Sequence, residues 1–267
     1  MRDGNARHDV ADTAVDPNDP ATLFVPSFAI DEPRYYSNNY INSSVNPWDT
    51  GPLATKAKLE KYGFDLLGGV LDKLGLDFRT GGYGPNYMCD SEPLTPLTND
   101  YRLLKRKVND FEAKGNTNVT EGVAWGARVL SQQEPFAGGD PENGLIKIMV
   151  VLTDGANTFG VMGNRLRSRY SSYGYMIDGR LDGEVNASGS KSTRLMNNKT
   201  LEACNFAKES GVDIYTIRLE VRDTGTGSMM RSCASRPDQY FDTPSSRQLK
   251  DVFEKIGEQI VRLRLST

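Results

Sequence analysis

Hydrophobic residues are distributed unevenly along the chain. Over residues 1–92 the apolar stretches are short and are interrupted by Pro, Asn, Asp and Gly. From Pro93 onward, β-branched runs alternate with segments in which apolar residues recur every three or four positions. The first part predicts a long, partly ordered, loop-rich insertion with one amphipathic candidate helix at 54–74. The second part, residues 93–267, predicts strands that alternate with helices.

The predicted elements of this second part follow one another in an order typical of α/β proteins. Capping-box patterns, Asn118 with Glu121 and Ser245 with Gln248, mark two of the helix starts. Strands alternating with helices predict a doubly wound, mostly parallel, Rossmann-like sheet. We expect strands at 94–97, 147–153, 213–221 and 239–242, helices at 99–115, 118–130, 198–210, 228–235 and from 249 onward, and a second loop-rich insertion at 155–196.

Composition and motifs exclude several classes of function. With 32 basic and 35 acidic side chains the net charge is only -3, so no basic field favours nucleic acid. The single histidine, His8, lies in a polar stretch, which argues against histidine catalysis and histidine-bound zinc. No nucleophile elbow, phosphate-binding loop or signal peptide is recognisable, and no apolar run approaches eighteen residues. We therefore expect a binding protein and not an enzyme.

The three cysteines leave two alternatives open. In an oxidising compartment Cys204 and Cys233 would pair, and Cys89 would need a partner from elsewhere. In a reducing cytosol all three would be buried free thiols.

Two oxygen-bearing residues are the strongest candidates for chemistry. A β-branched strand ends abruptly in Thr153-Asp154-Gly155, and such a strand delivers its last side chain to the carboxyl edge of a parallel sheet. Thr117 follows a Gly-Asn turn just before a predicted helix. Hydroxyl and carboxylate oxygens are ligands that Mg²⁺, Mn²⁺ or Ca²⁺ prefers, so Thr117 and Asp154 predict a divalent-cation site. The alternatives are that Asp154 only ends a strand and that Thr117 only caps a helix.

These residues resemble a known family. The order of the Thr117 turn, a helix, the strand into Thr-Asp-Gly and the elements after it is similar to the latter part of a von Willebrand factor A domain. More narrowly, the chain resembles the C-terminal region of TadG-like proteins of bacterial tight-adherence (Flp) pilus systems. The similar segments are NTNVTEGVAWG at 116–126, VLTDGANT at 151–158, and residues 21–26, 84–87, 214–221 and 256–260.

The resemblance implies a metal-ion-dependent adhesion site, of which one part is missing. The family's site combines Asp-x-Ser-x-Ser after the first strand, a threonine in a later turn and an aspartate after the fourth strand. Thr117 and Asp154 fill the second and third parts. The first part is absent, which predicts that the chain is N-terminally truncated, that Met1 is an internal methionine, and that the chain alone aggregates and binds metal poorly.

Two segments imitate other motifs. Residues 186–190 have Ser-x-Ser spacing but follow no hydrophobic strand. Residues 224–229 follow a strand, but Asp223 is one position out of register. The same region imitates a dinucleotide fingerprint, Gly225-x-Gly227-x-x-Met230, in which Met230 replaces the third glycine. Nucleotide binding is therefore the least favoured alternative.

The resemblance also implies a partner and a location. An open coordination position on the ion would accept a carboxylate from a pilus or envelope protein. We expect side chains of the loop after Asp154 to contact that partner, namely Asn157, Arg169, Tyr170, Tyr173 and Tyr175. Relatives are tethered by an N-terminal membrane helix, which implies an extracytoplasmic location in the cell envelope. A structural envelope domain with a vestigial ion site is the main alternative.

Overall fold

The computed structural model describes residues 9–24, 91–136, 138–139, 145–163, 166–243 and 245–266. The candidate helix at 54–74, and with it most of the predicted insertion at 1–92, lies outside these residues. No helix among the described residues is long and apolar enough to cross a membrane.

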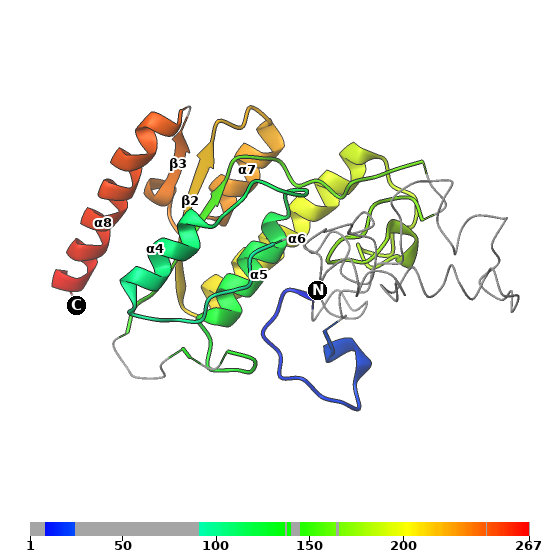
Figure 1. The fold of residues 1–267 in the computed structure, drawn as a ribbon, viewed down its shortest axis with the longest axis horizontal. Helices are drawn as coiled ribbons and strands as arrows, with labels where there is room; N and C mark the ends of the chain where they lie inside the picture. Colours follow the sequence, from blue (N-terminus) through cyan, green and yellow to red (C-terminus); the bar gives the residue numbers. More distant parts are fainter. Residues whose placement is uncertain are drawn as a thin grey trace, which may run out of the picture.

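The centre of the structure is a parallel sheet of three strands in the order β1-β2-β3 (Figure 1). The strands are β1 (Lys147–Thr153), β2 (Val212–Leu219) and β3 (Tyr240–Thr243). β1 pairs with β2 along its whole length, and β3 pairs with the second half of β2. The prediction of an α/β fold with a parallel sheet is confirmed at this level. All three strands end at one edge of the sheet, where Asp154 follows β1.

Helices cover the sheet on both faces. Three of them, α5 (Val119–Val129), α6 (Gly189–Glu209) and α7 (Thr224–Cys233), share one apolar cluster with Met149 and Ile214. A fourth helix, α8 (Leu249–Ser266), packs its Val252 and Ile256 against Tyr215 and Ile217 on the other face. Consecutive residues along β1, and likewise along β2, therefore point into the clusters on opposite faces of the sheet, as the pleat of a strand requires. Short 3₁₀ helices lie at η1 (Pro20–Thr22), η2 (Met176–Asp178), η3 (Pro237–Gln239) and η4 (Ser246–Gln248).

Four predicted elements are wrong or displaced. The helix expected at 228–235 is α7, which begins four residues earlier, at Thr224. Residues 94–97 form no strand. The helix expected at 99–115 is α4, which is shorter and covers only Tyr101–Asn109. Asp100 caps it, because the Asp100 Oδ1 accepts hydrogen bonds from the backbone of the first turn, and the helix has no buried residue. α6 begins nine residues before the predicted position because the Ser188 hydroxyl accepts a hydrogen bond from the backbone N–H of Lys191, 3.2 Å away. The second insertion therefore ends at Ser188 instead of residue 196.

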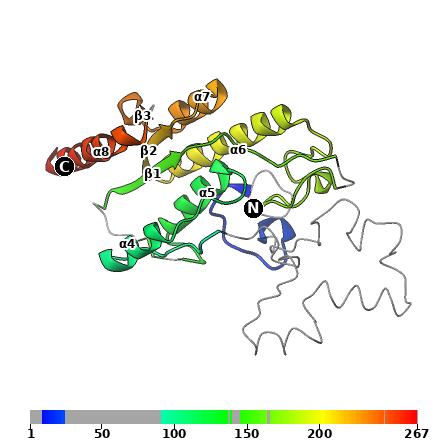
Figure 2. The same cartoon turned by 45° about the horizontal axis from the view of Figure 1, so that its top comes forward.

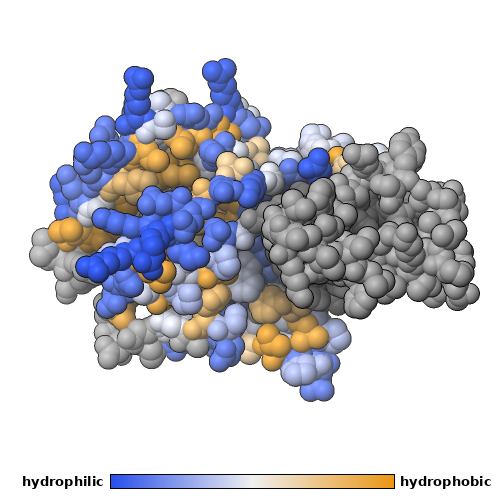
Figure 3. Space-filling model, in the orientation of Figure 1, coloured by the Kyte–Doolittle hydropathy of each residue, from blue (hydrophilic) through white to orange (hydrophobic). Residues whose placement is uncertain are grey.

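The outer edge of β1 has no neighbouring strand in the described part of the chain. On this strand Val150 is 38% exposed and Leu152 is 42% exposed. Both side chains lie on the face of the sheet that α8 covers at β2 and β3 but leaves partly open at β1. α4 lies beside the outer edge of β1, but none of its residues is buried (Figure 2). In the view of Figure 3, apolar surface is visible over the sheet, above the polar surface of α4. Between Lys147 and Asp154 this edge carries no charge and no proline, and such an apolar edge is a template for pairing with another chain.

We expect this edge to cause self-association of the isolated chain. Replacing Val150 and Leu152 with lysine should reduce light scattering in concentrated solution, because a charged edge resists pairing. The folding free energy should change by no more than about 1 kcal/mol, since both side chains are partly exposed. Val185→Lys is a matched control, because Val185 is 50% exposed in a loop away from the strand edge. Equal scattering by the double variant and the control would contradict this expectation.

Candidate functional site

The loop after β1 and the turn before α5 lie against each other at the carboxyl edge of the sheet. A Cβ atom placed on Gly155 would be only 2.6 Å from Thr117 Oγ1, so the Thr117 side chain packs directly on the residue after Asp154. The backbone N–H of Thr158 donates to the Thr117 carbonyl at 2.9 Å. Asp154 is exposed and Thr117 is half-buried. The structure thus brings the two predicted donor segments together, and glycine at position 155 permits the contact.

Local hydrogen bonds fix both segments. Thr153 Oγ1 donates to the Gly155 carbonyl at 2.8 Å and lies 3.3 Å from the Gly155 N–H, which closes a tight turn around Asp154. The Asn118 side chain caps α5 by accepting from the Glu121 N–H at 3.2 Å. Its amide also donates to Ser172 Oγ at 2.8 Å, which ties the capping residue to the second insertion. The Asn118–Glu121 helix start predicted from the sequence is confirmed.

A cavity of about 360 Å³ lies beside the Thr117 turn. Its wall is formed mainly by carboxamides, hydroxyls, one carboxylate, one lysine side chain and two aromatic rings. The Glu121 carboxylate, at this wall, accepts a hydrogen bond from Trp125 Nε1 at 2.6 Å. The polar wall and its position next to Thr117 make the cavity part of the same site. Its lining includes Asn116, Asn118, Glu121, Thr158, Tyr170 and Ser172.

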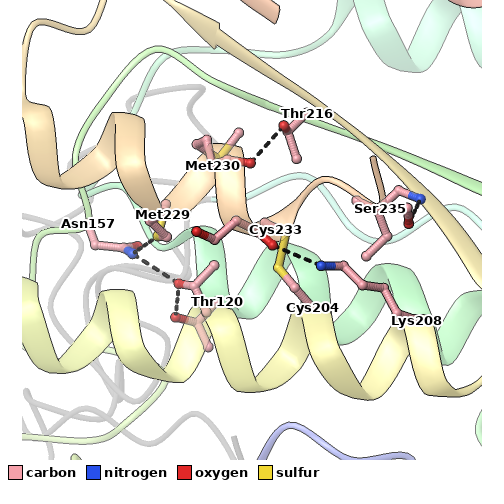
Figure 4. Close-up of a disulfide and its surroundings, with 12 residues drawn as sticks. Thr120, Asn157, Cys204, Lys208, Thr216, Met229, Met230, Cys233 and Ser235 are labelled. Atoms are coloured by element: carbon pink, nitrogen blue, oxygen red, sulfur yellow. Dashed lines mark hydrogen bonds between the residues drawn. A yellow bond between two sulfur atoms is a disulfide. The ribbon is translucent and has the colours of Figure 1, made fainter. Parts of the chain in front are cut away.

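Asn157, which we expected at the surface, is completely buried. Its Oδ1 accepts from the Val119 N–H at 2.8 Å, at the first turn of α5. Its Nδ2 donates to Asn197 Oδ1 at 2.9 Å and to Thr200 Oγ1 at 3.1 Å, both on α6, and lies 3.5 Å from Met229 Sδ on α7 (Figure 4). One amide therefore connects the loop after Asp154 to three helices.

Two of the four remaining residues that we expected to contact a partner are also buried. Tyr173 is completely buried against Phe159, with ring centroids 5.8 Å apart, and this burial raises the pKa of its phenol. Tyr175 is buried as well, in an edge-to-face contact with Tyr170. Arg169 is exposed and Tyr170 is half-buried at the cavity wall. Only Arg169 and Tyr170 therefore keep a surface on which a partner would bind.

The donor set fits a weakly held hard cation. Within the described residues no three His, Cys, Asp or Glu side chains form a group that would enclose a metal ion. A hydroxyl and a carboxylate on touching loops are the minimum that Mg²⁺ uses when it keeps several waters in its shell. Thr117 and Asp154 match that chemistry, with most of the coordination left to water.

The two imitating segments have structural roles. Ser188, in the segment 186–190, is the cap of α6. Asp223 caps α7 by accepting from the Thr226 N–H at 2.6 Å, a hydrogen bond that lowers the pKa of the carboxyl. A dinucleotide phosphate would need the position that this carboxylate occupies. A Cβ on Gly227 would come within 2.2 Å of Arg218 Nη1, so this glycine makes room for a side chain.

Cys204 of α6 and Cys233 of α7 are joined by a disulfide, and both are completely buried (Figure 4). Of the two alternatives that the sequence left open, the structure has the oxidised pair. Because α6 and α7 both contact Asn157, the disulfide braces the helices on which the loop after Asp154 rests.

Comparison of the chain with protein-family models, with curated proteins and with solved structures finds no match.

Proposed function

We propose that this chain is a metal-ion-dependent protein-interaction module of a bacterial tight-adherence pilus assembly system, and that it is not an enzyme. In this proposal the parallel sheet is part of a von Willebrand factor A fold, and its carboxyl edge is the binding surface. The observation that carries the proposal is the packing of the Thr117 side chain on Gly155, next to Asp154. It joins the two segments whose sequences resemble the family's site.

The mechanism we infer is a ligand exchange. A bound divalent cation would supply a positive charge and an open coordination position for a carboxylate of the partner. The Thr117 hydroxyl would face the cation directly or through water, and the Asp154 carboxylate would act through water. Asn157 would keep the two donor segments in register. Arg169 and Tyr170 would contact the partner at the rim of the cavity.

The proposal places the domain on the extracytoplasmic side of the cell envelope, with pilus or envelope proteins as partners. The buried disulfide supports this placement, because disulfides persist in oxidising compartments.

We expect weak Mn²⁺ binding that depends on Asp154. Water-proton relaxation with Mn²⁺ alone should show a low-affinity site, and Asp154→Ala should weaken it by roughly tenfold or more, because it removes the site's carboxylate. Thr117→Val should weaken binding, whereas Thr117→Ser, which keeps the hydroxyl, should not. Asp251→Ala is the matched control, because Asp251 is exposed on α8. Equal affinities in all variants would contradict the proposal. Tight stoichiometric binding to the wild-type chain would contradict the expectation that this chain alone binds metal weakly.

A structural envelope domain with a vestigial site is the second candidate, favoured by the small donor set of two oxygen-bearing side chains. Asp154→Ala in the cell separates the two. If the variant folds and pilus assembly fails, the interaction module is supported. If assembly proceeds unchanged, the structural domain is supported.

A further inference from the structure

Residues 9–24, which we call the amino-terminal strap, dock on α5 and α6 through two buried cations. Arg128 of α5 is 1% exposed, and its Nη2 donates to the carbonyls of Asp9 at 2.9 Å and Ala11 at 3.3 Å. Its guanidinium also lies over the rings of Phe24 and Trp125, 5.1 and 4.8 Å from their centroids. Lys199 of α6 is completely buried and holds the Asp9 side chain from the other side.

The charges at this contact do not balance. Lys199 Nζ lies 3.1 Å from Asp182 and 3.1 Å from Glu202, but 3.9 Å from Asp9 Oδ2. One ammonium therefore serves three carboxylates, and Asp9 is both the most deeply buried and the farthest from it. Asp9 Oδ1 accepts no hydrogen bond from the described part of the chain. An ionised Asp9 is therefore poorly compensated while the strap is docked.

We propose that docking of the amino-terminal strap is pH-sensitive, tight in mildly acidic solution and weaker in alkaline solution, with the Asp9 carboxyl beside Lys199 as the sensor. Protonation of Asp9 leaves Lys199 to Asp182 and Glu202 and removes the uncompensated charge. Deprotonation restores it, and undocking then allows water to solvate the carboxylate.

The direction follows from the burial of the Asp9 carboxyl and from the charges that act on it; the Arg128 guanidinium binds the Asp9 main-chain carbonyl. Burial raises the pKa of Asp9 from 3.8 to about 6; Lys199 and the chain's amino terminus lower it, and Asp182 and Glu121 raise it further. For Lys199, burial lowers the pKa, but hydrogen bonds to Asp182 and Glu202 outweigh this and leave it raised, so the ammonium stays charged. Docking raises the pKa of Asp9, so protonation of Asp9 stabilises the docked strap. This stabilisation is complete below pH 3.8, the ordinary pKa of the carboxyl, and is lost as the pH rises through about 6.

Hydrogen exchange at pH 4 and pH 8, corrected for the intrinsic rates, tests the proposal on the full chain. Protection of the strap should fall by up to about a hundredfold between the two pH values, which corresponds to a two-unit difference in pKa. Peptides from α6 should show no comparable change, which separates undocking from global unfolding. Asp9→Asn should abolish the pH dependence in the strap, whereas Asp19→Asn, which replaces an exposed carboxylate of the same segment with an equally capable cap, should preserve it.

Two results would overturn the proposal: a strap whose protection is independent of pH in the wild-type chain, or an unchanged pH dependence in Asp9→Asn. Lys199→Met provides a second variant. Without the ammonium, the midpoint of the strap transition should move to higher pH, and an unchanged midpoint also counts against the proposal.

Discussion

Replacing Asn157 with alanine should lower the free energy of unfolding by about 3 kcal/mol. The side chain is completely buried, and its loss leaves the Val119 N–H and the partners on α6 without their hydrogen bonds. Each buried polar group left unpaired costs about 1 to 3 kcal/mol, and the removed amide also leaves a small cavity. Urea unfolding should show a lower midpoint with an unchanged slope.

Asn186→Ala is the matched control for this prediction. Asn186 is exposed in the same insertion, so its replacement should change the stability by less than about 0.5 kcal/mol. If Asn157→Ala is as stable as this control, Asn157 does not connect the loop to the helices as the structure indicates. Mn²⁺ affinity measured on the folded fraction of Asn157→Ala should also decrease, because the register between Thr117 and Asp154 depends on this amide.

The sequence predicted the parts of the fold that local patterns determine. The β1 run of apolar residues, the Asn118–Glu121 helix start and the close packing of the Thr117 turn on the Asp154 loop each follow from a few neighbouring residues and the geometry of parallel strands. The strand expected at 94–97 did not form, because Pro96 lies within this four-residue segment and proline cannot donate a ladder hydrogen bond.

The roles of single polar side chains were not predictable. The motif at 151–158 indicated Asn157 as a surface residue, but burial depends on the packing of α6 and α7, which come forty or more residues later. Lys199 appears in a polar stretch of α6 typical of a solvent-exposed face, and only the folded chain shows that Asp9 and Asp182 surround it. Tertiary contacts over long sequence separations decide both cases.

Removing the disulfide should destabilise the domain by about 3 to 4 kcal/mol, the value expected for closing a loop of this length in the unfolded chain. The bond joins residues 29 positions apart. Cys204→Ala with Cys233→Ala is the appropriate pair of substitutions, because both sites are completely buried and serine would place an unpaired hydroxyl there. Urea unfolding of the double variant should occur at a lower midpoint, and the wild-type chain unfolded with a reductant should behave in the same way.

Thiol counting tests whether the bond is present before any stability is compared. The chain has three cysteines, and a disulfide between two of them leaves Cys89 as the reactive thiol of the denatured, unreduced protein. Reduction should raise the count to three. Because both sulfur atoms are buried between α6 and α7, the folded protein should resist a mild reductant that acts rapidly in urea. Three reactive thiols before reduction would show that α6 and α7 are held by packing alone, and the double variant would then lose only the small free energy of two buried sulfur atoms.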